Sequence, residues 1–205
     1  MILNVAMSSK IIIGIDPGTV VMGYGVISVE GSKVEVLAMG VVALDKFEDH
    51  YVRLRLIFEK TLSLIEQYLP DELAIESPFF GKNMQIALKL GRVQGIAMAA
   101  ALYRDIPIAE YAPRKVKQSI TGNGNATKEG VLMMLQQILK ITDIPQFLDA
   151  SDGLAVALCH HLQTHNALPK NKVETSSKIP KSKAKKGNQW GSFVNNNQDR
   201  VLNKS

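Results

Sequence analysis

The chain has 205 residues, 46% of them hydrophobic and 21% charged, proportions typical of a folded globular protein rather than a disordered one. Its apolar runs are shorter than the about 20 residues of a membrane span, and no leader precedes Ile11, so we expect a cytoplasmic protein without membrane association. A single cysteine, Cys159, excludes an internal disulfide and argues against a zinc module.

The net charge of +5 is distributed unevenly along the chain. Residues 163–205 carry nine Lys and Arg against two acids, whereas residues 1–162 carry 15 against 17. Because the basic segment is rich in Asn, Ser and Lys, it cannot form a core, and we expect a disordered tail that serves as a solubilising appendage or a nonspecific tether. The sequence therefore predicts an extension over 1–10, a folded domain over 11–165 and a basic tail over 166–205.

The first strands are indicated by β-branched and alternating apolar residues. A buried strand over 11–15 ends at the turn sequence Asp16-Pro17-Gly18. The segments 23–29 and 34–42 follow, separated by a short turn at Gly31, and this spacing predicts a hairpin beside the first strand. Three adjacent antiparallel strands are expected.

Helices and strands then alternate. Apolar residues recur at helical spacing over 52–69, Pro70 ends that helix, and a short strand over 73–75 ends at Glu76. The rest of the pattern predicts helices over 83–103, 127–139 and 148–162 and a strand over 106–110. Three antiparallel strands followed by alternating helices and strands predict an α/β fold with a mixed sheet.

Two of these helices carry further expectations. Ala87, Gly91, Gly95 and Ala99 form a stripe of small residues, which predicts a close-packing surface within the subunit or across a dimer. In the helix over 127–139 we expect Val131, Leu135 and Ile138 to face inward.

Four acidic residues lie at positions where a charged side chain is structurally unfavourable. Asp16 and Glu76 each end a hydrophobic strand, and Asp149 and Asp152 lie three residues apart near the start of a helix, so both project from one face. If the two strands are neighbours and the helix crosses their ends, the four carboxylates converge. Converging carboxylates repel unless a cation neutralises them, and oxygen ligands favour Mg²⁺ or Mn²⁺ over zinc. Two such ions are suited to phosphodiester hydrolysis.

Each acid taken singly has a simpler explanation. Asp16 before Pro17 can form a turn, Asp149 can cap a helix, and Glu76 can be an exposed charge at a strand end. The order of the acids, after the first strand, after the fourth and on the last helix, is that of the ribonuclease H-like nuclease fold. This order favours the catalytic interpretation.

Four sequence blocks resemble the RuvC family of Holliday junction resolvases. They are GIDPGTVVMGYGVI at 14–27, AIESPFFGKNMQIALKLGRVQG at 74–95, YAPRKVKQSITGNGNATKEGV at 111–131 and DASDGLAVALCHH at 149–161. The resemblance implies a ribonuclease H-like mixed sheet flanked by helices, and two Mg²⁺ ions, replaceable by Mn²⁺, on Asp16, Glu76, Asp149 and Asp152. At the position of Asp149 the family uses either Asp or His.

The resemblance also implies substrate and partners. It predicts a homodimeric endonuclease that nicks four-way junction DNA symmetrically, leaves a 5′-phosphate for ligation, and works with the RuvA and RuvB branch-migration proteins in recombination and repair. Phe79 matches the family's base-contacting aromatic, which wedges into the opened junction. Lys117 and Lys128 match lysines that approach the DNA backbone and could stabilise charge on the cleaved phosphate.

These assignments have alternatives. Phe79 could be a core residue, and Lys117 and Lys128 could be solvated surface charges. The alternative function is another ribonuclease H-like nuclease that acts on RNA or branched DNA, whereas a noncatalytic DNA-binding module would gain nothing from acids that repel phosphate. A sugar kinase or actin-like ATPase is excluded, because residues 163–205 cannot form the second lobe. His160, His161 and Cys159 are expected to be structural.

Overall fold

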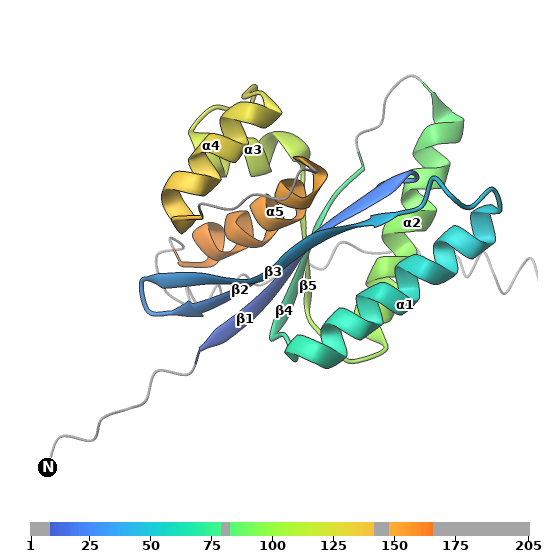
Figure 1. The fold of residues 1–205 in the computed structure, drawn as a ribbon, viewed down its shortest axis with the longest axis horizontal. Helices are drawn as coiled ribbons and strands as arrows, with labels where there is room; N and C mark the ends of the chain where they lie inside the picture. The colour runs from blue at the N-terminus through green and yellow to red at the C-terminus, as the bar shows by residue number, and fades with distance from the viewer. Residues whose placement is uncertain (1–8, 79–82, 142–147, 166–205) are drawn as a thin grey trace, which may run out of the picture. The chain divides into compact units, whose positions relative to one another are not determined.

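The computed structural model describes residues 9–78, 83–141 and 148–165. Within these ranges five strands form one sheet and five helices flank it (Figure 1). The strands are β1 (Lys10–Asp16), β2 (Val21–Glu30), β3 (Lys33–Ala43), β4 (Glu72–Glu76) and β5 (Ile108–Tyr111). The helices are α1 (His50–Tyr68), α2 (Met84–Leu102), α3 (Pro113–Thr121), α4 (Lys128–Leu139) and α5 (Leu148–His165).

The sheet has the mixed topology that the sequence predicts. Its strand order is β3-β2-β1-β4-β5, in which β1, β2 and β3 pair antiparallel, β4 runs parallel to β1, and β5 runs parallel to β4. β2 and β3 are joined by a two-residue turn at Gly31, whose φ of 58° is one that glycine adopts without strain. The α/β fold with three antiparallel strands followed by parallel strands is confirmed.

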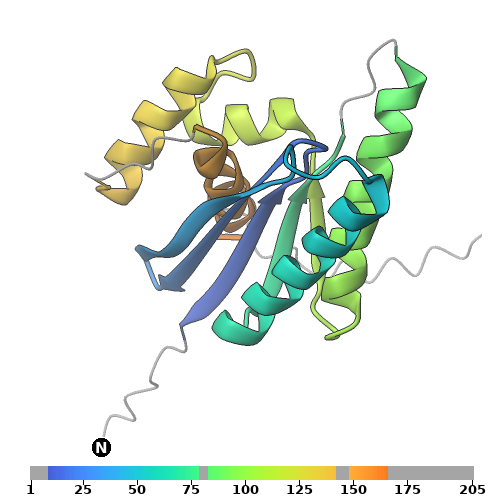
Figure 2. The same cartoon turned by 45° about the vertical axis from the view of Figure 1, so that its right-hand side comes forward.

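The helices form one layer on each side of the sheet. α1 and α2 cover one face, and α5 lies on the other with α3 and α4 beside it (Figures 1 and 2). Alternate residues of β1 serve the two layers, because side chains in a strand point to opposite faces. Ile13 and Ile15 join the core under α1 and α2, whereas Ile12 packs with Leu154 and Ala157 of α5.

The helix starts follow from capping side chains. Asp49 accepts hydrogen bonds from the backbone N–H groups of the first turn of α1, Asn83 does the same for α2, and the Thr127 hydroxyl caps α4. α1 ends at Tyr68 because Leu69 adopts the left-handed conformation, and Leu69 is 76% exposed rather than part of the apolar face.

Three local expectations were wrong or incomplete. The sequence interpretation placed no helix at α3, although Pro113 at its first turn and Gly122 as its left-handed C-cap are both helix signals. β5 begins at Ile108 and ends at Tyr111, two residues later at its start than expected. Ile138 does not face inward, since it is 42% exposed, while Val131 and Leu135 are buried as predicted.

The stripe of small residues on α2 is only partly covered by the described part of the chain, in which Ala87 is buried. Gly91 and Gly95 are exposed, and a methyl group added at either would meet nothing within 4 Å. Among the helices of the described ranges, none combines the length and apolarity needed to cross a bilayer.

Candidate active site

α5 lies unusually close to the sheet because glycines line the surface beneath it. We refer to Gly14, Gly23 and Gly25 of β1 and β2 as the glycine seat. A Cβ atom at Gly14 would stand 2.2 Å from the carbonyl oxygen of Gly153, and one at Gly23 would stand 2.1 Å from that of Asp149. Any larger side chain would push α5 away from the strands. The glycine seat therefore determines how far the acids of α5 lie from the sheet.

Strand register brings the first two acids together. Ile15 pairs with Ile75 across the parallel β1–β4 ladder, so the next residues, Asp16 and Glu76, end the two strands side by side. Since Ile15 and Ile75 belong to the core under α1 and α2, Asp16 and Glu76 point to the opposite face, toward α5. The two strands are therefore neighbours, which is the condition under which the sequence argument expects the acids to converge.

The first turns of α5 supply the other two acids. Lys128, the first residue of α4, donates hydrogen bonds from Nζ to Oδ1 of Asp149 at 3.0 Å and to Oδ2 of Asp152 at 2.6 Å. Asp152 is the more enclosed of the pair, with 17% of its side chain exposed against 45% for Asp149. The shared lysine demonstrates that both carboxylates project from one face of the helix, as their spacing predicts.

The acids and lysines meet around one hollow of about 210 Å³. Asp16, Glu76 and Asp152 line it, together with Lys117 of α3 and Lys128 of α4. Asp149 stands beside it, held by Lys128. The rest of the wall is apolar and consists of Pro113, Val116, Val131 and Ala155. Five elements therefore contribute to a site whose polar groups are four carboxylates and two amines.

Enclosure and mutual repulsion change the acidity of these groups. Burial first, then the charge of Asp152, raises the pKa of Asp16 from 3.8 to about 6. Burial and the charges of Asp16 and Asp152 raise the pKa of Glu76 from 4.5 to about 8. Burial also raises the pKa of Asp152, although Lys128 opposes that shift. Three neighbouring carboxyl groups thus resist ionising together, as expected for a cluster that needs positive charge.

The amines supply part of that charge. Partial burial lowers the pKa of Lys128, but its hydrogen bonds to Asp152 and Asp149 outweigh this effect and raise it, so Lys128 is charged at neutral pH. Lys117 and Lys128 both lower the pKa of Glu76. Even so, Asp16 and Glu76 keep raised pKa values. Two lysines therefore do not neutralise the four acids.

The donor set fits a hard divalent cation. All four acidic side chains offer carboxylate oxygens, which Mg²⁺ and Mn²⁺ prefer, and the site contains no thiolate or imidazole ligand. In their present positions, no three Asp, Glu, His or Cys side chains of the described residues are close enough together to enclose one ion.

The other residues singled out in the sequence fall in different places. Phe79 lies outside the described residues. Cys159, His160 and His161 are buried in α5, at 0%, 4% and 8% exposure, which agrees with their expected structural role. The features that sequence reasoning missed are the glycine seat and α3, which carries Lys117. Glycines at alternate positions of a strand, as at Gly23 and Gly25, were the available signal for close packing.

Comparison with known proteins agrees with this geometry. The family model described as crossover junction endodeoxyribonuclease RuvC matches residues 12–160. The chain is 53% identical over 195 residues to the protein of that name from Porphyromonas gingivalis. The matched residues make up 94% of this chain and 97% of the relative. It is 63% identical over 159 residues to that of Bacteroides fragilis, covering 77% and 85%.

Solved structures show the same similarity. Thermus thermophilus RuvC in complex with Holliday junction substrate superposes with a TM-score of 0.70 at 32% identity and covers 76% of this chain and 94% of that one. The yeast mitochondrial Holliday junction resolvase Ydc2 has the same fold, with a TM-score of 0.57 at 16% identity over 76% of this chain and 80% of that one.

Proposed function

The chain belongs to the RuvC family of crossover junction endodeoxyribonucleases, and from this premise we propose how its residues cut a four-way DNA junction. It is a Holliday junction resolvase, a DNA-binding hydrolase of recombination and repair. The family is metal-dependent, and we assign the metal-holding role to Asp16, Glu76, Asp149 and Asp152. The observation that carries this assignment is the meeting of Asp16, Glu76 and Asp152 around one hollow, all three with raised pKa values. Asp149 is held beside them by Lys128.

The cofactor we propose is a pair of Mg²⁺ ions per subunit, with Mn²⁺ as a substitute. Bound there, such ions would activate a water molecule and stabilise charge on the scissile phosphate and the leaving oxygen. Asp16 and Glu76, on adjacent strand ends, form the fixed side of the site, and Asp152 faces them from α5. Asp149 is more exposed and completes the set from the outer side.

The two lysines are proposed to act on the DNA. Lys117 and Lys128 line the same hollow from α3 and α4, so both amines lie where a backbone phosphate would meet the carboxylates. Lys128 holds Asp149 and Asp152 in the geometry described, and its charge is available to phosphate when these acids turn to a cation. Both lysines would thereby counter the negative charge that builds up during cleavage.

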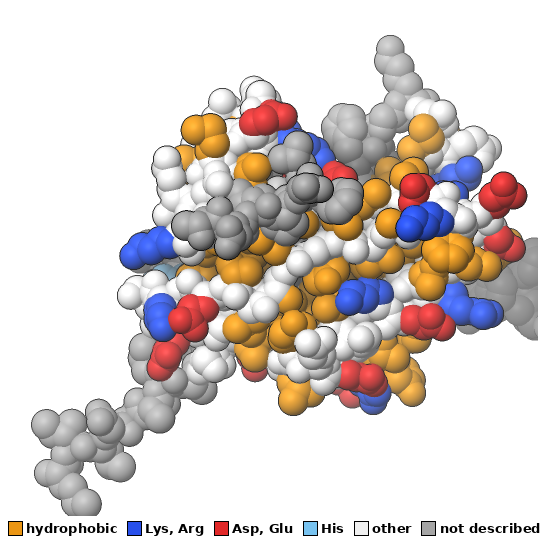
Figure 3. All heavy atoms as spheres, viewed as in Figure 1, with side chains coloured by type: hydrophobic (Ala, Val, Ile, Leu, Met, Phe, Trp, Pro, Cys, Tyr) orange, Lys and Arg blue, Asp and Glu red, His pale blue; other side chains and the backbone are white. Residues whose placement is uncertain are grey.

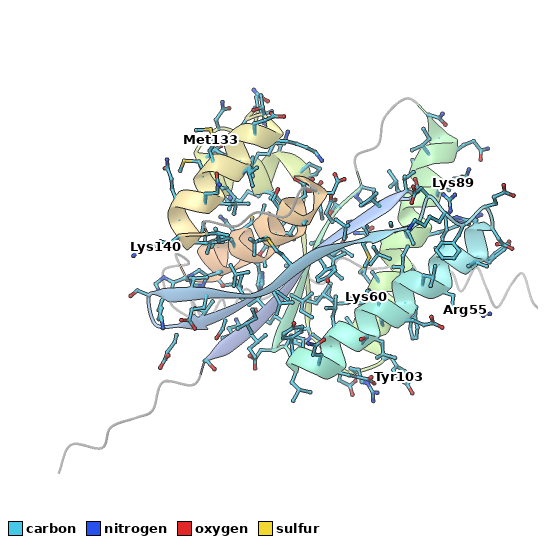
Figure 4. The ribbon with its side chains drawn as sticks, viewed as in Figure 1. Arg55, Lys60, Lys89, Tyr103, Met133 and Lys140 are labelled. Carbon is cyan, nitrogen blue, oxygen red and sulfur yellow. The ribbon has the colours of Figure 1, made fainter. Side chains whose placement is uncertain are left out.

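DNA contacts beyond the hollow are proposed at the end of the sheet where β1 and β4 finish. Figure 4 shows Lys89 on the part of α2 nearest that end, and we propose that Phe79, in the preceding segment, stacks on bases of the opened junction. On the face seen in Figure 3, Lys and Arg are interspersed with Asp and Glu. The described residues of that face therefore form no broad basic surface for a DNA arm.

A homodimer suits a substrate with two-fold symmetry, since each subunit then cuts one of two equivalent strands. The first turns of α2 expose Met84 and Leu88 at 71% and 53%, on the side of the helix that also carries the open surface of Gly91. We propose this face as the contact with a second copy. By family, RuvA and RuvB are the expected partners, and the enzyme is expected to work in the cytoplasm, where the DNA is.

The test is cleavage of a synthetic four-way junction by wild type, Asp16→Asn and Glu76→Gln. Both variants should lose Mg²⁺-dependent cleavage by several orders of magnitude yet bind the junction as well as wild type, because a ligand and a phosphate-repelling charge are both removed. Glu59→Gln, an exposed acid on α1, is the matched control and should cut normally. Normal cleavage by Glu76→Gln, or equal cleavage of junction, linear duplex and RNA hybrid by wild type, would refute the assignment.

A further inference from the structure

A connected set of polar side chains lies between α5 and the sheet, apart from the hollow. His160 has only 6% of its side chain exposed. Its Nδ1 lies 2.7 Å from the Tyr111 hydroxyl, and its Nε2 is hydrogen-bonded to the Glu72 carboxylate. Glu72 is also paired with Lys10, whose Nζ lies 2.6 Å from Oε2. A neutral ring that donates from Nε2 to Glu72 accepts at Nδ1 from Tyr111, so both nitrogens are satisfied.

The network around His160 is connected to the strands that end in Asp16 and Glu76. Lys10 is the first residue of β1, whose last residue is Asp16, and Glu72 is the first residue of β4, whose last residue is Glu76. Tyr111 is the register partner of Glu76 in β5. Its carbonyl oxygen also accepts a 2.8 Å hydrogen bond from the backbone N–H of the residue that follows Glu76.

His160 itself shares α5 with the helix-borne acids. It lies eight residues after Asp152, which corresponds to about 12 Å along the helix. The glycine seat determines how closely α5 approaches the sheet, and the surrounding apolar contacts, such as those of Ile12 with Leu154 and Ala157, are not directional. Hydrogen bonds from one ring to two different strands are directional and resist sliding along the helix axis.

We propose that His160 is a positioning residue of the nuclease site. Through Glu72 and Tyr111 it fixes α5 along β4 and β5, and thereby sets where Asp149 and Asp152 stand relative to Glu76. The inference rests on the proposed function, because the register of α5 matters to activity only if acids from the helix and the strands hold the same cations. Displacements of about 1 Å at such a site cost up to about a hundredfold in rate.

The test compares four full-length variants by Mn²⁺ binding without DNA, measured by calorimetry, together with melting temperature and the Mg²⁺ concentration for half-maximal cleavage. His160→Leu removes both hydrogen bonds and should weaken Mn²⁺ binding about tenfold, within the range known for outer-shell partners of metal ligands. Tyr111→Phe keeps the ring and removes one of the two hydrogen bonds of His160, so a smaller loss than that of His160→Leu is expected. His160→Gln can still donate to Glu72 and should recover part of the affinity.

His161→Leu is the matched control. His161 is the adjacent buried histidine of α5, and the ring that it contacts is that of His165 on the same helix, at 5.3 Å between centroids. Its loss should lower the melting temperature and leave Mn²⁺ affinity within about twofold of wild type.

Two results would overturn the inference. If His160→Leu and Tyr111→Phe melt at lower temperature but bind Mn²⁺ as wild type does, the network only stabilises the fold. If His160→Leu does not fold, Tyr111→Phe decides alone, and unchanged Mn²⁺ affinity in it counts against positioning. A wild-type protein that neither binds Mn²⁺ nor cuts junctions would instead refute the proposed function, which separates the two failures.

Discussion

Gly25→Ala tests whether close contact between α5 and the sheet is a condition of activity. Gly25 lies in β2 directly under α5, and a Cβ atom there would stand 2.4 Å from Cα of Leu154 and 2.6 Å from its nitrogen. Ordinary contact begins at 3.4 Å, so α5 must retreat by about 1 Å, the difference between 3.4 and 2.4 Å. The obstacle is helix backbone, which cannot turn aside as a flexible side chain would.

Two effects of different size follow. Overpacking of this kind costs about 1 to 3 kcal/mol, more than the roughly 0.5 to 1 kcal/mol that alanine gains over glycine inside a strand. Because Asp149 and Asp152 move with α5, a shift of about 1 Å should also reduce cleavage by the folded protein by about a hundredfold. We therefore expect modest destabilisation and a much larger loss of activity.

The assay pairs urea denaturation with cleavage of a synthetic junction at saturating Mg²⁺. Gly130→Ala in α4 is the control, since its added methyl would meet only the Thr127 hydroxyl at 3.5 Å. That variant should gain about 0.5 to 1 kcal/mol from helix propensity and keep full activity. Wild-type stability together with wild-type cleavage in Gly25→Ala would refute the claim that the glycine seat positions the acids.

Three further predictions concern pH, Phe79 and the tail. Folding raises the pKa of Asp16 from its ordinary value of 3.8 to about 6 and the pKa of Glu76 from 4.5 to about 8. The contribution of these two groups to stability is therefore present at low pH and is lost as pH rises through 6 to 8. In EDTA, Glu76→Gln should therefore melt above wild type by a margin that grows between pH 5 and pH 8.5, and a constant margin would contradict the raised pKa. Phe79→Ala should keep its melting temperature and lose about tenfold to hundredfold in cleavage, with Phe79→Trp partly active, whereas a core residue would cost about 3 to 5 kcal/mol of stability instead. A chain truncated after His165 should resolve a synthetic junction at close to the full-length rate, and loss of folding or activity would contradict the domain division.

The sequence alone determined the order and type of most elements and the identity of the acids. Alternation and helical spacing are local properties, so the strand before Asp16 and the helix that carries Asp149 and Asp152 could be located from neighbouring residues. Acids at the ends of apolar strands were conspicuous for the same reason. The two short features that failed, the helix at Pro113 and the start of β5, are those in which few residues carry the pattern.

Tertiary structure decided how the acids meet. The parallel register of Ile15 with Ile75 places Asp16 beside Glu76, and no local pattern specifies which strands pair. Lys128 reaches Asp149 and Asp152 only because α4 lies next to the start of α5. The function of Gly25 likewise depends on Leu154, a residue far away in the sequence. Distances between remote segments depend on packing of the whole core, so the raised pKa values of Asp16 and Glu76 exist only in the folded protein.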